Sequence, residues 1–288
     1  MKQAILAVSF GTSYPEAELS CILPVEAALA KAFPGHDVHR AYSSRIIVRK
    51  LRECGEAIES EAEALERLRR EDYGEIAVVP THILHGIEYE VVKEAAGDLR
   101  VSEPLLETQA DLSWMAGLLG KLAAEEGRPL LMMGHGTEHA ADETYARLRK
   151  QLPENVYLAC VEGEHSLEKQ LPALERLSVK EIALMPLMLV AGDHARNDMA
   201  GDDRDSWKSI LTRRGFDVRV RMQGLGALPE VQAIRGKGAD NHLKQVNRAV
   251  AEAQESAAAP DLYCKSFSTS ARCSFTCRNS STACWMRS

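Results

Sequence analysis

The sequence predicts an α/β protein with two pseudo-symmetric, Rossmann-like lobes, each built on a parallel sheet. Two observations support this fold class. Short apolar runs alternate with longer segments of helical periodicity along most of the 288 residues, a pattern typical of βαβ units with helices on both faces of a sheet. The second half of the chain also repeats strand sequences of the first half in the same order.

The first half opens with a nearly continuous apolar run, as expected of a buried parallel strand. A segment with apolar residues at helical spacing follows and stops at Pro34-Gly35. Applied along this half, the same criteria predict strands over residues 4–10, 37–42 and 76–79 and helices over residues 16–33, 46–51 and 58–69.

The second half follows the same plan. It is predicted to hold strands over residues 130–133, 156–161, 181–190 and 217–222, and helices over residues 142–151, 167–177 and 206–213. We therefore divide the chain into an N-terminal lobe (residues 1–124), a C-terminal lobe that carries metal ligands (residues 125–234) and an atypical tail (residues 235–288).

The tail is predicted to be partly disordered. Its last 25 residues are rich in Ser and Thr, carry four cations and no acid, and hold four of the seven cysteines. These cysteines form no CxxC pair, so a zinc site is not expected. Disulfides are not expected either in a protein of the cytoplasm.

Three pairs of strand sequences support a duplication. Phe10-Gly11-Thr12 resembles His135-Gly136-Thr137, and residues 38–41 resemble residues 156–159. The third pair is the most similar, with Glu75-Ile-Ala-Val-Val-Pro80 against Glu181-Ile-Ala-Leu-Met-Pro186. One such pair would mean little, but three in the same order indicate two related lobes whose strand ends face one cleft.

The strand ends of the second half carry His139, Glu162 and His194, which we predict to bind a metal. Ligands of parallel α/β sheets bind beyond the carboxyl ends of the strands. Two imidazoles and one carboxylate suit cobalt, nickel, iron or zinc and leave coordination positions open for substrate. The corresponding residues of the first half are Tyr14, Ser44 and Glu88.

Each of these residues also has an ordinary interpretation. His135 occupies the position of Phe10 and is predicted to be structural, and Glu162 could simply cap the following helix, with Glu164 as a competitor. His82 and His85 flank the third strand of the first half and are further candidates for the cleft. The other histidines have no obvious partner and are interpreted as ordinary: His36, His39, His165 and His242.

The turns after the first strand of each half offer backbone N–H groups to an anion. Neither Gly11-Thr12-Ser13 nor Gly136-Thr137 matches GxGxxG or a Walker A loop, so no nucleotide is expected. Carboxylates of an acidic substrate fit such turns, and Arg45 and Arg49 could add positive charge, although solvated helix residues are the simpler interpretation. GxSxG and HExxH are absent from the sequence, which disfavours hydrolases of those types.

Charge and hydropathy exclude other classes. The net charge of −7 argues against nucleic acid as a partner. The longest apolar run, residues 182–191, is too short to span a membrane. The first residues resemble no signal peptide, so we expect a cytoplasmic protein. The sequence is compatible with a homo-oligomer but does not specify one.

Three motifs lie at these strand ends. They are Val8-Ser-Phe-Gly-Thr-Ser-Tyr14, Met133-Gly-His-Gly136, and Met185-Pro-Leu-Met-Leu-Val-Ala-Gly-Asp-His194 followed by Asn197-Asp-Met199. Together they resemble the sirohydrochlorin cobaltochelatases of anaerobic cobalamin synthesis, which are ATP-independent class II chelatases related in fold to ferrochelatase. The resemblance extends from residue 1 to about residue 234.

This resemblance implies that Co²⁺, as substrate metal, is inserted into a sirohydrochlorin-type tetrapyrrole without nucleotide. It implies metal binding by His139, Glu162 and His194, and catalysis by His139, His194 and Glu88, with His139 as first choice for the proton acceptor and His194 as second. Substrate contacts are expected from residues at the strand ends of the N-terminal lobe: Phe10, Gly11, Thr12, Ser13, Ser44, Arg45 and Gly86. Two alternatives stay open, a chelatase that prefers Fe²⁺ or Ni²⁺ and a tetrapyrrole or metal carrier that binds without inserting.

Overall fold

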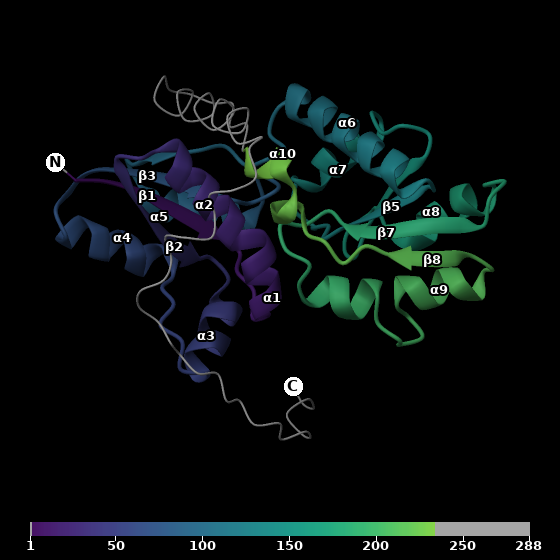
Figure 1. Cartoon of the computed structure of the whole chain (residues 1–288), viewed down its shortest axis with the longest axis horizontal. Helices are drawn as coiled ribbons and strands as arrows, with labels where there is room; N and C mark the ends of the chain where they lie inside the picture. The colour runs from purple at the N-terminus through teal and green to yellow at the C-terminus, as the bar shows by residue number, and fades with distance from the viewer. Residues whose placement is uncertain (1, 234–288) are drawn as a thin grey trace, which may run out of the picture.

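The computed structural model describes residues 2–233, and the predictions for the tail lie outside them. The chain forms two four-stranded sheets that belong to two lobes, side by side in Figure 1. All strand pairs in both sheets are parallel. The predicted α/β class with two lobes is thus confirmed.

The N-terminal lobe is built around strand β1 (Lys2–Ser9), which pairs with β2 (His36–Tyr42) and β3 (Tyr73–Pro80). Six consecutive β1 residues are buried, as expected of a strand covered on both faces. The remaining elements up to the second lobe are α1 (Pro15–Ala17), the π-helix η1 (Glu18–Ile22), α2 (Leu23–Ala32), α3 (Arg45–Glu53), α4 (Glu61–Arg70), α5 (Ile87–Ala96), β4 (Arg100–Val101) and α6 (Gln109–Glu126).

The C-terminal lobe is built in the same way around β5 (Leu130–Gly134), which is buried throughout and pairs with β6 (Val156–Cys160) and β7 (Glu181–Pro186). The remaining elements are α7 (Asp142–Arg149), α8 (Leu167–Glu175), the π-helix η2 (Ala195–Met199), α9 (Trp207–Arg213), β8 (Asp217–Val220), the 3₁₀-helix η3 (Leu225–Ala227) and α10 (Pro229–Gln232). Helix α6 spans the expected boundary at residue 124, and its buried side chains pack with this lobe's sheet.

The internal repeat is visible in the topology. The strand order is β2-β1-β3-β4 in the first sheet and β6-β5-β7-β8 in the second, so corresponding strands occupy corresponding places. The glycines after the first strands also match in conformation, with φ of +97° at Gly11 and +81° at Gly136. Both turns therefore use the left-handed region that favours glycine.

Two predicted elements differ from the structure. The strand expected over residues 181–190 ends at Pro186, since a proline cannot donate to a continuing ladder. The chain then leaves the sheet, and Leu189 and Val190 pack against Ile22 and Tyr42 of the other lobe. The helix expected over residues 16–33 contains the π-helical turn η1, which no apolar spacing in the sequence announces.

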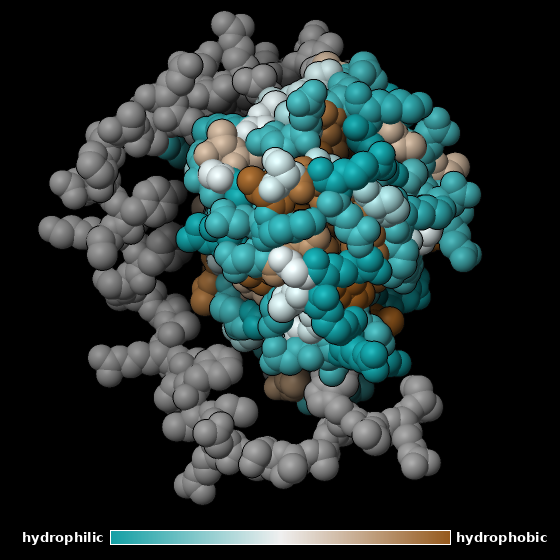
Figure 2. Space-filling model, turned by 90° about the vertical axis from the view of Figure 1, so that its right-hand side faces the viewer, coloured by the Kyte–Doolittle hydropathy of each residue, from teal (hydrophilic) through white to brown (hydrophobic). Residues whose placement is uncertain are grey.

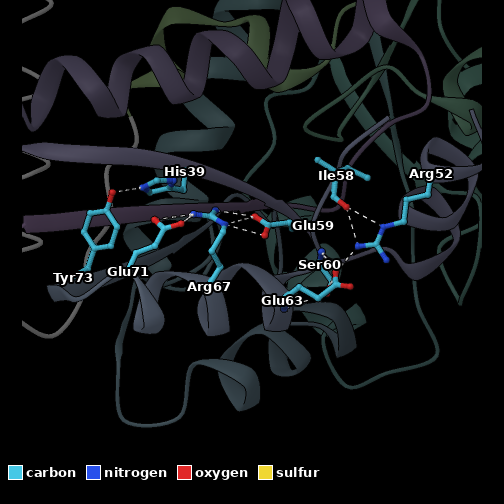
Figure 3. Close-up of polar contacts among 9 residues, drawn as sticks. All are labelled: His39, Arg52, Ile58, Glu59, Ser60, Glu63, Arg67, Glu71 and Tyr73. Atoms are coloured by element: carbon cyan, nitrogen blue, oxygen red, sulfur yellow. Dashed lines mark hydrogen bonds and ion pairs between the residues drawn. The ribbon is translucent and has the colours of Figure 1, made fainter. Parts of the chain in front are cut away.

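Helix α4 is fixed at the outer edge of the N-terminal lobe by polar contacts at its ends (Figure 3). Ser60 and Glu63 form a reciprocal capping box at its start. Near its end, Arg67 donates to both carboxylate oxygens of Glu59, at 2.8–3.0 Å, and pairs with Glu71. Because these groups are partly exposed, each ion pair contributes little stability beyond orienting the helix.

The face of the C-terminal lobe in Figure 2 is mostly hydrophilic, with hydrophobic residues scattered between hydrophilic ones. Scattered apolar residues of this kind are normal on protein surfaces. Within residues 2–233, no helix has both the length and the apolarity required to cross a bilayer.

Candidate functional site

Three strand-end loops of the C-terminal lobe meet at His135. The backbone N–H of Glu162, after β6, donates to the His135 carbonyl at 2.8 Å. The imidazole of His194, after β7, lies edge to face against the His135 ring, with 4.8 Å between ring centroids. Residues that are far apart in the sequence therefore converge at the carboxyl edge of the second sheet, as expected of a parallel α/β site.

Gly136 allows two of these loops to approach each other. A Cβ atom added at Gly136 would lie 1.9 Å from the carbonyl oxygen of Glu162. No side chain fits there, and the positive φ of this residue also favours glycine. The second glycine of the Gly-His-Gly motif is therefore required by the structure, because only a residue without a Cβ can pack this closely against the Glu162 backbone.

His194 is oriented by a carboxylate one helical turn further along. Its Nδ1 lies 2.7 Å from Oδ2 of Asp198, within the π-helix η2. A carboxylate only accepts, so Nδ1 carries the proton, and the lone pair of Nε2 is available to a metal or a proton. Such a carboxylate partner fixes the tautomer and raises the basicity of a metal-binding imidazole. π-Helical turns are frequent at functional sites.

In His139 the Nδ1 atom accepts a hydrogen bond, whereas in His194 it donates one. The backbone N–H of Ala141 donates to His139 Nδ1 at 3.2 Å, so a neutral ring holds its proton on Nε2. The side chain is exposed on the β5–α7 loop, where Thr137 Oγ1 accepts from the His139 backbone N–H at 3.0 Å. To bind a metal through Nε2, His139 must exchange this tautomer for the other.

The sequence missed the position of His135. It predicts a structural role by analogy with Phe10, whereas the structure places His135 exposed beside His194. His135 Nδ1 lies 2.8 Å from the carbonyl oxygen of Gly136, so Nδ1 donates and the Nε2 lone pair is left available. The residue type could have indicated this position, because the second half of the repeat has a histidine where the first half has Phe10, and histidine at a strand end can bind a ligand.

The expected substrate residues of the N-terminal lobe divide into exposed and structural ones. Phe10 is 46% exposed and offers an apolar face, and Ser13 is partly exposed. Gly11 and Thr12 are buried: the Tyr42 ring would lie 2.6 Å from a Cβ at Gly11, and Thr12 Oγ1 accepts from Tyr14 N–H. This turn therefore contributes its conformation more than its side chains.

The loops of the two lobes touch at this turn. Thr12 Oγ1 lies 4.0 Å from the position that a Cβ of Gly192 would occupy. Tyr14 donates its hydroxyl to Asp193 at 2.9 Å, while burial and this hydrogen bond raise the pKa of Tyr14. The guanidinium of Arg196 lies 4.3 Å from the Tyr14 ring centroid, and Arg196 pairs with Glu16 at 2.5 Å. We call these four residues, Tyr14, Glu16, Asp193 and Arg196, the interlobe latch.

The remaining expected residues lie at helix starts of the N-terminal lobe. Ser44 is buried and caps α3, accepting from the Ile47 N–H at 3.4 Å, and Arg45 is exposed in the first turn of that helix. Gly86 precedes α5, where a Cβ would meet no neighbour within 4 Å. Glu88 lies in the first turn of α5, where the helix dipole favours a carboxylate.

A buried carboxyl lies near two of these residues. Glu61 is 4% exposed, and burial raises its pKa. The charge of Glu88 raises it further and that of Arg45 lowers it, so both groups act electrostatically on Glu61. The sequence did not single out Glu61, because a glutamate at a helix start is ordinary.

Two lobes of identical strand order, with two adjacent imidazoles and a glutamate at the strand ends of the second, are the architecture of the two-lobed α/β metal chelatases. Sequence comparison gives the particular family. The chain matches the cobalt chelatase (CbiK) family over residues 3–246 and belongs to it. The match continues past residue 234, where the resemblance was expected to end, into residues outside the described part of the chain.

Two relatives are similar over most of their length. The sirohydrochlorin cobaltochelatase of Salmonella typhimurium is 36% identical over 267 residues, which cover 88% of this chain and 100% of that protein. Sirohydrochlorin cobaltochelatase CbiKC of Nitratidesulfovibrio vulgaris is 34% identical over 230 residues, which cover 75% of this chain and 81% of that protein. The family predicted from the strand-end motifs is confirmed.

Solved structures share the fold. CbiX, the terminal enzyme of siroheme biosynthesis in denitrifying bacteria, is 17% identical with a TM-score of 0.50, covering 87% of this chain and 99% of its own. SirB from Bacillus subtilis is 15% identical with a TM-score of 0.52, covering 90% of this chain and 96% of its own. At these identities the likeness concerns the fold alone.

Proposed function

We propose that this chain is a sirohydrochlorin cobaltochelatase that inserts Co²⁺ into a sirohydrochlorin-type tetrapyrrole without nucleotide, in anaerobic cobalamin biosynthesis. The observation that carries the proposal is the convergence of His194 and Glu162 on His135 at the strand ends, in a chain of the cobalt chelatase family. Nitrogen donors with one carboxylate suit cobalt and leave coordination positions open.

For metal binding, we propose His194, Glu162 and His139 as ligands. His194 is the ligand best prepared by its surroundings, because Asp198 holds its Nε2 lone pair available. His139 joins after its proton moves from Nε2, at the cost of the hydrogen bond from Ala141. An incoming hydrated cation exchanges water for these ligands before it meets the macrocycle.

Metal insertion releases two protons, because the two pyrrole N–H groups of the macrocycle are exchanged for bonds to Co²⁺. An imidazole nitrogen that binds the metal cannot accept a proton at the same time. We therefore assign proton acceptance to His135, whose Nε2 lone pair is available, and to Glu88 in the opposite lobe. His139, which the sequence ranked first as proton acceptor, is also less well prepared by its hydrogen bonding to be a metal ligand than His194.

For tetrapyrrole binding, we propose a division between apolar and charged contacts. Phe10, exposed at the end of β1, offers an apolar face to the macrocycle. Arg45, exposed at the start of α3, offers positive charge to the acidic side chains of the substrate. A cytoplasmic location, a homo-oligomer and the absence of nucleic-acid and nucleotide partners stay predictions from the sequence.

The test mixes the purified chain with sirohydrochlorin and Co²⁺ in the absence of nucleotide and follows the absorption spectrum. We expect fast cobalt-dependent conversion, and loss of at least about a hundredfold in rate for His194→Ala. Parallel reactions with Fe²⁺ and Ni²⁺ measure metal preference. Tetrapyrrole binding without any metal insertion would contradict the proposal and support a carrier, and faster insertion of Fe²⁺ or Ni²⁺ would reassign the metal.

A further inference from the structure

We propose that His85, Glu103 and Glu107 form a second binding site for a divalent transition-metal cation, in the N-terminal lobe. One ligand atom from each of these side chains lies within 4.8 Å of the other two, and all three residues are partly buried. Metal–ligand bonds of about 2.1 Å place opposite ligand atoms about 4.2 Å apart, so the existing separation is within a small side-chain movement of coordination.

The two loops that carry these residues are fixed to each other. His85 lies between β3 and α5, and the glutamates lie between β4 and α6. The backbone N–H of Leu105 donates to the His82 carbonyl at 3.0 Å, and that of Leu106 donates to the Ile83 carbonyl at 2.9 Å. Leu106, 1% exposed, anchors the second loop in the core. The cluster is therefore held by backbone contacts and does not depend on flexible surface chains.

The hydrogen bonding of His85 calls for a cation. Its Nε2 contacts the carboxylate of Glu90, and its Nδ1 lies 3.3 Å from Oε2 of Glu107. A second ring proton would let both nitrogens donate, whereas a neutral imidazole has a single proton and must present one lone pair to a carboxylate oxygen. If Glu90 accepts from Nε2–H, as carboxylates do behind metal-binding histidines, the Nδ1 lone pair faces Glu107. A metal ion at Nδ1 removes that repulsion.

Negative charge concentrates at the same place. Tyr89, 2% exposed, packs its ring against His85 with 4.5 Å between centroids. Burial raises the pKa of Tyr89, and the charges of Glu103, Glu107 and Glu90 raise it further. Three carboxylates therefore surround one buried ring, an arrangement that attracts a dication.

A second, independent group lies at the cluster. His82 and Glu103 line the same small cavity, of about 20 Å³, at the junction with Leu189 and Val231 of the other lobe. His82 Nε2 lies 3.0 Å from Ser43 Oγ, and its buried Nδ1 has no hydrogen-bond partner among the described residues. Burial lowers the pKa of His82 to about 4, so the ring is neutral. A buried imidazole nitrogen without a partner in the described part of the chain, on the loop that leads to His85, leaves an unsatisfied ligand atom at the edge of the cluster.

The composition of the site selects its occupant. One imidazole and two carboxylates favour Co²⁺, Ni²⁺ or Zn²⁺ over Mg²⁺, which prefers oxygen ligands and retains its water. The hydrogen bond with His85 lowers the pKa of Glu90, and the charge of His139 in the other lobe lowers it further, so the candidate metal centre acts electrostatically on the carboxylate that holds His85. If the proposed function holds, the second site would retain Co²⁺ close to the place of insertion.

The experiment titrates the full chain with Co²⁺ alone, by calorimetry and by the visible absorption of bound cobalt. We expect two Co²⁺ per chain in the native protein and one in His139→Ala/His194→Ala. Glu103→Gln/Glu107→Gln should weaken the remaining site at least tenfold, whereas Glu94→Gln, an exposed glutamate on the neighbouring helix, should not. Unchanged stoichiometry and affinity in Glu103→Gln/Glu107→Gln would overturn the proposal.

A measurement on the unaltered protein guards against variants that fail to fold. Paramagnetic Co²⁺ strongly shifts the NMR signals of the imidazoles that bind it. The ring protons of His85 should therefore shift when the protein is titrated with Co²⁺. Unshifted His85 ring signals at saturating Co²⁺ would also overturn the site. Because no tetrapyrrole is present, this result is independent of insertion. A chain that binds two Co²⁺ but inserts none would retain the second site and refute only the proposed function.

Discussion

Two histidines of the candidate metal centre have opposite hydrogen bonds, and this difference decides which of them is prepared for a metal. His194 donates from Nδ1 to Asp198, whereas His139 accepts at Nδ1 from the backbone of Ala141. Only the first arrangement leaves Nε2 with a lone pair in the neutral ring. The aspartate is a positioning residue, since it acts through His194.

We predict that Asp198→Asn lowers Co²⁺ affinity and insertion rate by about 10- to 100-fold, because the imidazole loses the carboxylate that orients it and raises its basicity. Calorimetric titration with Co²⁺ and the insertion assay measure the two effects. Asp203→Asn, an exposed aspartate that follows η2, is the matched control and should leave both unchanged. Equal affinity in Asp198→Asn and the native chain would remove Asp198 from the site.

His82 gives a prediction for stability against pH. Burial lowers its pKa from 6.5 to about 4 in the folded chain. As the pH falls through this interval, the unfolded chain binds a proton that the folded chain does not, so the free energy of unfolding decreases. Above pH 6.5 the contribution is fully present.

Urea unfolding between about pH 7 and pH 4 tests this dependence. In His82→Gln, whose amide can still reach Ser43, the decrease in free energy of unfolding should be smaller than in the native chain. The comparison of the two proteins removes the common background from other titrating groups. Identical slopes in both proteins would show that His82 is protonated as easily in the folded state as in the unfolded one.

At the residue scale, the sequence predicted positions at strand ends but not hydrogen bonds. His139, Glu162 and His194 were identified because the repeat aligned three strand ends. The tautomers of His139 and His194 depend on Ala141 and Asp198, which no spacing rule singles out. His135 was interpreted as structural because its counterpart is Phe10, and periodicity does not distinguish an exposed ring from a buried one.

The turn at Gly136 is an element whose geometry can be tested. An alanine at this position would place its Cβ against the Glu162 carbonyl in a left-handed conformation. We predict that Gly136→Ala lowers the free energy of unfolding by roughly 2 kcal/mol or more. Gly86→Ala, with a negative φ of −100° and no neighbour within 4 Å, should change it by less than about 0.5 kcal/mol. Urea denaturation measures both, and equal values would contradict the close approach.

Strands were easier to predict than the helices that position the site. The parallel strands are short apolar runs, and the internal repeat predicts which strands of the two lobes correspond. The π-helices η1 and η2 were not predicted, since their hydrogen-bond pattern leaves no periodic signal in the sequence. Helix α6 was overlooked although its buried residues pack on the second sheet, because apolar residues occur on most of its faces.

At the scale of the whole molecule, the lobes are joined by apolar packing and by polar contacts at the cleft. Leu189 and Val190 pack into a cluster of the N-terminal lobe, and Gly226 of η3 lies so close to Cys21 that a Cβ would be 2.4 Å from its carbonyl oxygen. These contacts pack one lobe against the other. The interlobe latch joins them directly at the strand ends, immediately beside His194.

The latch should therefore affect substrate binding more than stability. Glu16 is 61% exposed and Arg196 31% exposed, so their ion pair contributes at most about 1 kcal/mol to folding. Without the latch, a larger fraction of molecules holds the lobes apart, and the apparent affinity for a substrate bound between them decreases by that fraction. We predict that Tyr14→Phe/Glu16→Gln raises KM for sirohydrochlorin several-fold, with a free energy of unfolding within about 1 kcal/mol of the native value.

Insertion kinetics and urea unfolding measure the two quantities, and Lys208→Gln is the matched control. It breaks the 2.7 Å ion pair with Asp202, which is at least as exposed as the latch pair but lies inside one lobe. KM should be unchanged in this control, because the relative position of the lobes does not depend on it. Higher salt screens the substrate charges in both proteins, but it should raise KM of the native chain more than that of the latch variant, since only the native chain also has the exposed Glu16–Arg196 pair. A native KM in the latch variant would mean that apolar packing alone sets the position of the lobes.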